Sequence, residues 1–219
     1  MKSEHPLLIN NQVFLLLADK AIYWPKHKAL LIADAHFGKA AAYRALGQPV
    51  PQGTTLENIR RLNALIAQYP TEQLIFLGDF LHAPKSHAKP TLDALRSWRH
   101  QHANIKCILV RGNHDLNAGD PPPDLNIQVV AEPYLIDDFA LQHIPKPHAT
   151  HHVIAGHIHP TYRLQGKGRQ SLILSCFQHE SSMTLLPSFG DFTGGFLMKQ
   201  TGNAKFFVTD SKYVWPITL

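Results

Sequence analysis

The chain has 219 residues, 44% of them hydrophobic, so it can bury a core without disulfide bonds, and we expect one domain over residues 1–219. Lys and Arg (21) outnumber Asp and Glu (16), and the formal charge of +5 favours a polyanionic substrate, although many basic proteins of this size never contact nucleic acid. The apolar run near the N-terminus is too short and polar for a signal peptide or a membrane span, and the two cysteines lie in apolar runs typical of buried thiols in a reducing compartment, so we expect a cytoplasmic protein that binds no membrane.

The first half of the chain alternates apolar strands with amphipathic helices. The expected elements are a hairpin at 13–17 and 21–24, a strand at 29–33, a helix at 54–68, a strand at 74–77, a helix at 90–102 and a strand at 105–110. The helix at 54–68 has apolar residues at helical spacing, with Thr54 as its expected cap and Glu57 three residues later. This alternation is typical of a strand, helix, strand arrangement.

Three consecutive prolines at 121–123 predict a surface loop, after which the chain becomes rich in short strands. These are expected at 127–130, 134–136, 139–142, 153–155, 162–164 and 172–174. Together the two halves predict an α/β fold, a four-layer αββα sandwich of two mixed β-sheets flanked by helices.

Five short segments share one layout, in which an apolar strand is followed at once by polar residues able to bind a cation. They are Asp34-Ala35-His36, Gly78-Asp79, Gly112-Asn113-His114-Asp115, His143, and Gly156-His157-Ile158-His159. Because the carboxyl ends of strands meet at one edge of an α/β sheet, these side chains could build one pocket there. The chain also has 15 histidines, a number typical of a protein in which several are metal ligands.

This mixture of residue types suits a site for two divalent ions. Imidazole nitrogens and carboxylate oxygens bind Mn, Fe, Zn, Co or Ni, and one carboxylate can bridge two ions. Each segment alone also has an ordinary structural explanation, since Asp34 could cap a helix and Gly78-Asp79 is a common turn dipeptide. The occurrence of all five in order, each at a strand end, favours the metal site.

The ordered set Asp-x-His, Gly-Asp, Gly-Asn-His-Asp, His, Gly-His-x-His resembles the calcineurin-like metallophosphoesterase superfamily over about residues 30–160. The resemblance implies a metal-dependent phosphoesterase in which Asp34, His36 and His159 bind one ion, Asn113, His143 and His157 bind the other, and Asp79 bridges them. It also implies that His114 protonates the leaving alkoxide, that Asp115 orients His114, and that a metal-bridging hydroxide attacks phosphorus. Manganese is the first expectation for the two ions.

Four stretches resemble a narrower family, the PdeM group of bacterial phosphoesterases, named as ligase-associated DNA-damage-response endonucleases. They are residues 34–39, 44–51 and 78–82 and a Gly- and aromatic-rich segment at 186–195. This resemblance implies a nuclease for DNA, with DNA-repair proteins such as a ligase or a helicase as candidate partners. The segment at 186–195 is explained equally well as a structural loop or as part of a substrate surface.

Some assignments leave alternatives open. His148, His151 or His152 could replace His143 as the isolated ligand, although His143 is favoured because it ends an apolar strand. A nucleic-acid substrate would require basic residues around the pocket, and the candidates are Lys39, Arg44, Lys85, Arg111, Lys146, Arg163, Lys167 and Arg169. Of these we expect Lys39 and Arg111 to bind substrate together with His82, while an exposed loop histidine is the ordinary explanation for His82.

Three other functions are open at this stage. A hydrolase for small phosphodiesters or nucleotides would use the same metals beneath a cap, and the sequence has no long insertion that would form one. A phosphoprotein phosphatase would use the same metals as well. A non-catalytic scaffold would be expected to have lost His114 or several ligands, but every expected position is filled.

Overall fold

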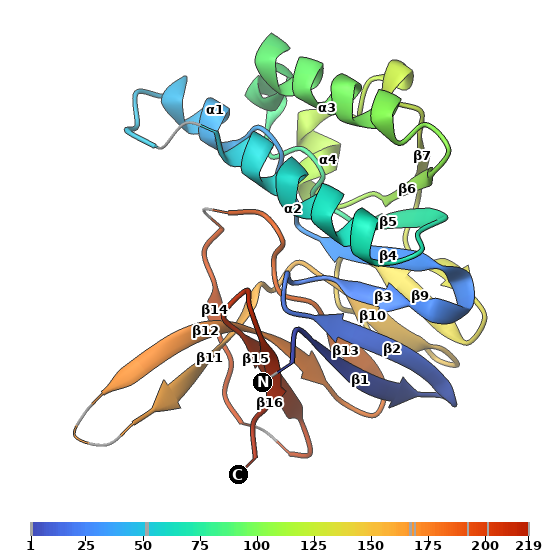
Figure 1. Ribbon diagram of the computed structural model, residues 1–219, viewed down its shortest axis with the longest axis vertical. Helices are drawn as coiled ribbons and strands as arrows, with labels where there is room; N and C mark the ends of the chain where they lie inside the picture. Colours follow the sequence, from blue (N-terminus) through green and yellow to red (C-terminus); the bar gives the residue numbers. More distant parts are fainter. Residues whose placement is uncertain are drawn as a thin grey trace.

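The structure, a computed structural model, describes residues 2–50, 53–166, 168, 170–191, 193–200 and 202–218. In this part of the chain the strands form two sheets, and the α-helices gather on one side of the first sheet (Figure 1). The expected α/β class with two mixed β-sheets is therefore confirmed.

The first sheet has the strand order β1-β2-β3-β4-β5-β6-β7, antiparallel from β1 to β4 and parallel from β4 to β7. Its strands are β1 (Glu4–Ile9), β2 (Gln12–Leu17), β3 (Ile22–Trp24), β4 (Ala29–Ala33), β5 (Gln73–Leu77), β6 (Lys106–Val110) and β7 (Ile127–Val130). The helices of this half are α1 (Lys39–Arg44), α2 (Thr54–Gln68), α3 (Lys89–Gln101) and α4 (Asn113–Ala118), with 3₁₀ helices η1 (Pro25–His27), η2 (Pro84–His87) and η3 (Pro123–Leu125). The parallel order brings the carboxyl ends of β4, β5 and β6 to one edge.

The second sheet has the order β14-β11-β12-β13-β10-β9-β8, and β15 and β16 extend it from β12. Its strands are β8 (Tyr134–Ile136), β9 (Phe139–Gln142), β10 (His152–Ala155), β11 (Pro160–Gln165), β12 (Ser171–His179), β13 (Met183–Leu185), β14 (Phe196–Leu197), β15 (Lys205–Thr209) and β16 (Val214–Pro216). Strands β9, β10 and β13 are parallel, so the residues after β9 and β10 emerge at a common edge.

The central strands are unbroken apolar runs because both of their faces are buried. Along β4, Leu30 and Ile32 pack toward the helices, where they meet Leu62 of α2. The alternate residues Leu31 and Ala33 belong to a second cluster, which joins the two sheets. From the second half of the chain this cluster contains Phe139, Leu141, Ile154, Phe177, Leu186, Phe207 and Val214. Each buried Leu, Ile or Phe stabilises the fold by roughly 1.5–3 kcal/mol, so this double burial fixes the position of the strand ends that follow.

The structure differs from the sequence prediction in several places. Thr54 is not the cap of α2, because Gly53 occupies that position with a positive φ of 87° and accepts a hydrogen bond from the Glu57 amide. Helices α1 and α4 and strands β1 and β13 to β16 had not been expected from the pattern. Helical cover is found only on the first sheet, since the described residues after 126 form no α-helix. Among the described helices, none has the length and apolarity needed to cross a bilayer.

Candidate metal centre

The five polar segments meet where strands of both sheets end. Asp34 follows β4, Asp79 comes two residues after β5, and Asn113 opens α4 after β6. From the second sheet, His143 follows β9, and the segment with His157 and His159 follows β10. The common edge expected for the parallel strands thus collects side chains from two sheets rather than one.

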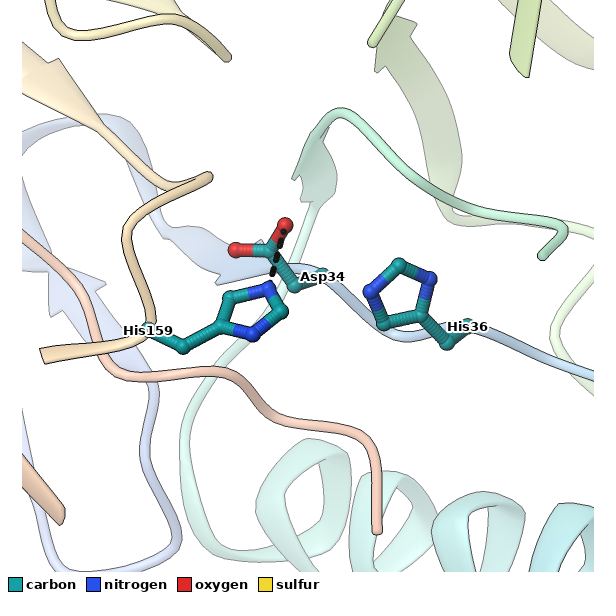
Figure 2. Close-up of side chains that lie close together, drawn as sticks. All are labelled: Asp34, His36 and His159. Carbon is teal, nitrogen blue, oxygen red and sulfur yellow. Dashed lines mark ion pairs between the residues drawn. The ribbon is translucent and has the colours of Figure 1, made fainter. Parts of the chain in front are cut away.

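The first group of side chains is formed by Asp34, His36 and His159, whose donor atoms lie within 4.8 Å of one another. Figure 2 shows the Asp34 carboxylate directed at the His159 ring, with Oδ1 3.2 Å from Nε2, and the ring of His36 beside it. Asp34 Oδ1 is buried and accepts no hydrogen bond from the described residues. A buried oxygen of this kind costs free energy unless a cation or a donor compensates it.

The second group forms around the ring of His143, which is fully buried. Its Nε2 lies 2.8 Å from Asn113 Oδ1, 3.0 Å from His157 Nδ1 and 3.4 Å from Asp79 Oδ1. The other oxygen of Asp79, Oδ2, lies 3.8 Å from His36 Nε2. Asp79 therefore faces both groups, and donor atoms of Asp34, Asp79 and His143 also lie within 4.8 Å of one another.

The electrostatics of the two groups fit divalent cations. Burial raises the pKa of Asp79, and the neighbouring Asp34 carboxylate adds to the rise. Burial lowers the pKa values of His36 and His157, so both imidazoles are neutral at pH 7, as ligands must be. For His159 burial is outweighed by the Asp34 carboxylate, and its pKa is raised. Two buried carboxylates, an orphaned oxygen and the neutral imidazoles of His36 and His157 match the mixed oxygen and nitrogen donors of a binuclear site.

The backbone of the centre is held in an unfavourable conformation. Asp34, His36, Asp79, His157 and His159 all have positive φ values, from 47° to 71°. Such conformations cost on the order of 1–3 kcal/mol each for residues other than glycine and persist only where the surrounding structure imposes them.

Two of the glycines beside these residues are required by close packing. A Cβ at Gly78 would collide with the His143 ring, and a Cβ at Gly156 would lie 2.6 Å from Asp34 Oδ2. Glycine before the polar residue thus allows the segments from the two sheets to approach each other.

Comparison with known proteins assigns the family. A family model described as calcineurin-like phosphoesterase matches residues 27–171, which include every residue of the centre. The chain belongs to the calcineurin-like phosphoesterase family. It is therefore a metal-dependent phosphoesterase, and the family implies divalent metal ions at a centre of this composition.

Solved structures include a similar protein. The crystal structure of Pseudomonas putida nuclease MPE is 47% identical, covers 98% of this chain and 100% of its own, and superposes with a TM-score of 0.87. A phosphoesterase from E. coli, Yfce, is 16% identical over 86% of this chain and 97% of its own, with a TM-score of 0.43. None of the curated proteins matches the chain.

His114 lies beside the two groups of the phosphoesterase centre. Its amide donates to Asp79 Oδ1 at 2.9 Å, and its ring Nε2 lies 3.9 Å from Asp79 Oδ2. The other ring nitrogen, Nδ1, is 2.9 Å from the carbonyl oxygen of His82. A backbone carbonyl accepts a hydrogen bond only from a protonated Nδ1, so Nε2 is the nitrogen left to face the centre.

Asp115 does not orient the His114 ring, which corrects the expectation from the sequence. Its carboxylate accepts hydrogen bonds from the backbone amides of Gly112, Asp79, Phe80 and Leu81 at 2.8–3.3 Å. Consecutive residues on a helix point in different directions, so Asp115 at the start of α4 turns inward while His114 does not. Burial raises the pKa of Asp115 to about 6.

Two of the three expected substrate residues lie close to the phosphoesterase centre. Lys39 is buried, which lowers the pKa of its amine, while the nearby carboxylates of Asp34 and Asp79 oppose that shift. The His82 ring stacks on the His114 ring at 4.9 Å with 23° between the planes, and Tyr43 packs against it at 5.5 Å. Burial lowers the pKa of His82 to about 4.

Arg111, the third expected substrate residue, is paired with a carboxylate. Its guanidinium donates two hydrogen bonds to the carboxylate of Asp120, at 2.9 and 2.6 Å. A substrate phosphate would have to compete with this bidentate ion pair, so we do not retain Arg111 among the proposed substrate residues.

The alternatives to His143 lie elsewhere. His152 is bonded to Thr184 Oγ1 and to the carbonyl oxygen of Ser181, and His148 and His151 pack against each other at 4.7 Å. Among the basic candidates, Lys85 is close to the carbonyl oxygen of Ala45 at 3.4 Å. Lys167, Arg169, Pro51 of the 44–51 stretch and Phe192 of the 186–195 segment lie outside the described residues.

Sequence reasoning missed the residues that support the centre from outside. Ser188 Oγ donates to the Asp34 carbonyl oxygen at 3.0 Å, and His159 Nδ1 lies 2.9 Å from the carbonyl oxygen of Gly194. The Gly-rich composition at 186–195 was the only sequence signal for these contacts. Tyr43, which covers His82, gave no signal because an aromatic residue in a short helix has no distinctive pattern.

Proposed function

We propose that this phosphoesterase is a nuclease that hydrolyses phosphodiester bonds of DNA and takes part in DNA repair. The observation that carries the proposal is the 47% identity to the Pseudomonas putida nuclease over 98% of this chain. The formal charge of +5 supports it, because a basic protein attracts a polyanionic substrate. The link to repair, with a ligase or helicase as partner and a cytoplasmic location, rests on the resemblance of the motifs to the PdeM group.

The proposed ligands divide as the two groups of donor atoms suggest. Asp34, His36 and His159 would hold one ion, Asn113, His143 and His157 would hold the other, and Asp79, which faces both groups, would bridge them. Bound there, two divalent ions, with manganese as our first choice, supply Lewis-acid stabilisation of the phosphate and lower the pKa of the attacking water.

His114 is the proposed general acid. Its Nδ1 proton is donated to the His82 carbonyl oxygen, so the imidazolium form presents the Nε2 proton to the centre. Transfer of that proton to the departing alkoxide oxygen completes cleavage of the P–O bond. Asp115 accepts hydrogen bonds from the backbone amides of residues 79–81. It thereby fixes the loop that carries Asp79 and the position of the Asp79 carboxylate.

Lys39 and His82 are the proposed substrate contacts. Lys39 is the positive charge that lies nearest in sequence to the first ligand segment and is electrostatically coupled to both buried carboxylates. A phosphate entering the centre would lie within reach of this field and would be stabilised by it. His82 covers one face of the His114 ring and is the neighbour that a leaving nucleoside would meet.

The test is hydrolysis by metal-stripped protein resupplied with Mn²⁺, using single- and double-stranded DNA and bis-p-nitrophenyl phosphate. We expect cleavage of DNA that requires the metal and is abolished by Asp79→Asn, with His100→Ala, a change at an exposed helical histidine, as the matched control. Cleavage of the small ester without cleavage of DNA would favour a hydrolase for small phosphodiesters. No hydrolysis with any divalent metal would favour the non-catalytic scaffold.

A further inference from the structure

A buried arginine on α2 joins this helix to the loop of residues 186–191 and 193–195, which we call the support loop. Arg61 is only 8% exposed, and its Nη2 donates to the carbonyl oxygen of Phe189 at 2.6 Å and to Asn58 Oδ1 at 2.8 Å. The same atom lies 3.4 Å from Asp191 Oδ1, and the guanidinium lies over the Phe189 ring, 4.4 Å from its centre. Arginines are rarely buried unless such contacts compensate the desolvated charge.

The support loop contacts the segment that carries Asp34. The amide of Phe189 donates to Ala33 O at 2.9 Å, and the amide of Gly190 donates to Asp34 O at 3.0 Å. Ser188 Oγ donates to the same Asp34 oxygen. From α2 itself, Asn58 Nδ2 donates to Ala35 O at 3.3 Å. Asp34 has a positive φ of 55°. The backbone on both sides of it is therefore held by the support loop and by Asn58, which accepts a hydrogen bond from Arg61.

The support loop also determines how His159 is presented. The Gly194 carbonyl oxygen lies 2.9 Å from His159 Nδ1, which must carry the proton for that hydrogen bond to form. Nε2 is then the nitrogen that points at the first group, 3.2 Å from Asp34 Oδ1 (Figure 2). Hydrogen bonds of this kind fix both the tautomer and the direction of a ligating imidazole.

The second group is supported by other elements. His143 Nδ1 lies 3.0 Å from Leu77 O, and the His143 amide donates to Glu132 Oε2 at 2.8 Å. Among the described residues, no hydrogen bond joins the support loop to Asn113, His143 or His157. Different contacts therefore orient the rings of the two groups, and among the described residues the hydrogen bond between the groups is the one that the His157 amide donates to Asp34 Oδ2 at 2.9 Å.

We propose that Arg61 is a positioning residue that controls the affinity of the ion held by Asp34, His36 and His159 and leaves the ion held by Asn113, His143 and His157 nearly unaffected. The proposal rests on the proposed function only for its assignment of ligands to two ions. Lysine cannot replace Arg61, because a single ammonium does not reproduce the planar group that bonds Phe189 O and Asn58 and covers the Phe189 ring.

The experiment compares Mn²⁺ binding by wild type, Arg61→Lys and Arg60→Ala. Arg60 is the neighbouring residue on α2, but it is exposed and pairs with Glu57, so it is a matched control. In calorimetric titrations of metal-free protein we expect two ions to bind to wild type and Arg60→Ala. In Arg61→Lys one ion should bind as in wild type and the other about tenfold more weakly, the size usual when an outer-shell partner of a ligand is lost.

Electron paramagnetic resonance gives a second readout that does not depend on activity. At a Mn²⁺ concentration that fills both sites of wild type, Arg61→Lys should show the spectrum of an isolated ion in place of that of a coupled pair. If Arg61→Lys proves unfolded by circular dichroism, Ser188→Ala takes its place with the same expectation, because its hydroxyl contacts the Asp34 carbonyl oxygen.

The proposal is overturned if the folded variant binds both ions with wild-type affinity, if it loses both equally, or if wild type itself does not bind two ions. An assay of DNA cleavage does not measure the affinity of each ion and so does not test the role of Arg61. Wild-type protein that binds two ions but cleaves no DNA would contradict the proposed function and leave the role of Arg61 to be decided by the titration.

Discussion

The His114 ring depends on a backbone carbonyl group rather than on a carboxylate. The Nδ1 contact with His82 O fixes the ring in one tautomer, while Asp115 is committed to four backbone amides. The ring is therefore oriented by a neutral group, and Nε2 is the nitrogen left to face the centre.

Replacing His114 should affect substrates according to their leaving groups. His114→Ala removes the proton donor, so cleavage of DNA, whose leaving alkoxide is strongly basic, should slow by roughly 10²–10⁴. Hydrolysis of bis-p-nitrophenyl phosphate should slow far less, because nitrophenolate leaves without protonation. Steady-state rates on both substrates at saturating Mn²⁺ provide the measurement, and an equal loss on both would contradict the role of general acid.

The two thiols should be protected in the native protein. Burial raises the pKa of Cys107 to about 11 and that of Cys176 to about 12, and both are free. Only the thiolate reacts readily, so neither cysteine should react with 5,5′-dithiobis(2-nitrobenzoic acid) at pH 8 before unfolding, and both should react in guanidinium. Rapid modification of the folded protein would show that β6, which carries Cys107, or β12, which carries Cys176, opens locally.

At the scale of elements, a pair of histidines joins three strands of the second sheet. His152 on β10 and His179 on β12 both hydrogen bond to Thr184 Oγ1 on β13, at 2.9 Å each. Burial lowers the pKa of His179 to about 4 and also lowers that of His152. Protonation of either ring would place an uncompensated charge between the strands.

This pair predicts a loss of stability in mild acid. The folded pKa of His179, about 4, lies below its unfolded value near 6.5, so the unfolded chain takes up the proton first as the pH falls. Its contribution is complete above pH 6.5 and should fall by about 1–2 kcal/mol at pH 5. Urea denaturation at pH 7.5 and 5.0 measures the change, and His179→Gln should reduce it. An unchanged pH dependence in that variant would refute the explanation.

At the scale of the molecule, the metal centre joins the two sheets. Asp34, Asp79 and Asn113 come from the end of the first sheet, whereas His143, His157 and His159 follow strands of the second. Ions held by all of these residues would bind the folded chain but not the unfolded one. They would therefore stabilise the packing of one sheet on the other.

Removal of metal should lower the melting temperature of the whole protein. An ion present at 100 times its dissociation constant adds about 2.7 kcal/mol to the free energy of unfolding. We expect a single melting transition that rises when Mn²⁺ is restored to stripped protein. In Asp79→Asn, which lacks the proposed bridge, the rise should be much smaller, as differential scanning calorimetry can measure. A rise as large in Asp79→Asn as in wild type would place the stabilising ions elsewhere.

The sequence by itself determined the order of most elements, the α/β class and the identity of the residues that meet at the centre. It could do so because apolar runs, helical spacing and polar residues at strand ends are local patterns. Only the tertiary structure decided that Asp115 binds the backbone amides of the Asp79 loop and does not orient the His114 ring. It also decided that Arg111 pairs with Asp120 and that Arg61 supports the Asp34 segment. These contacts depend on side-chain direction and on packing between distant segments, and the linear pattern of residues contains no information about either.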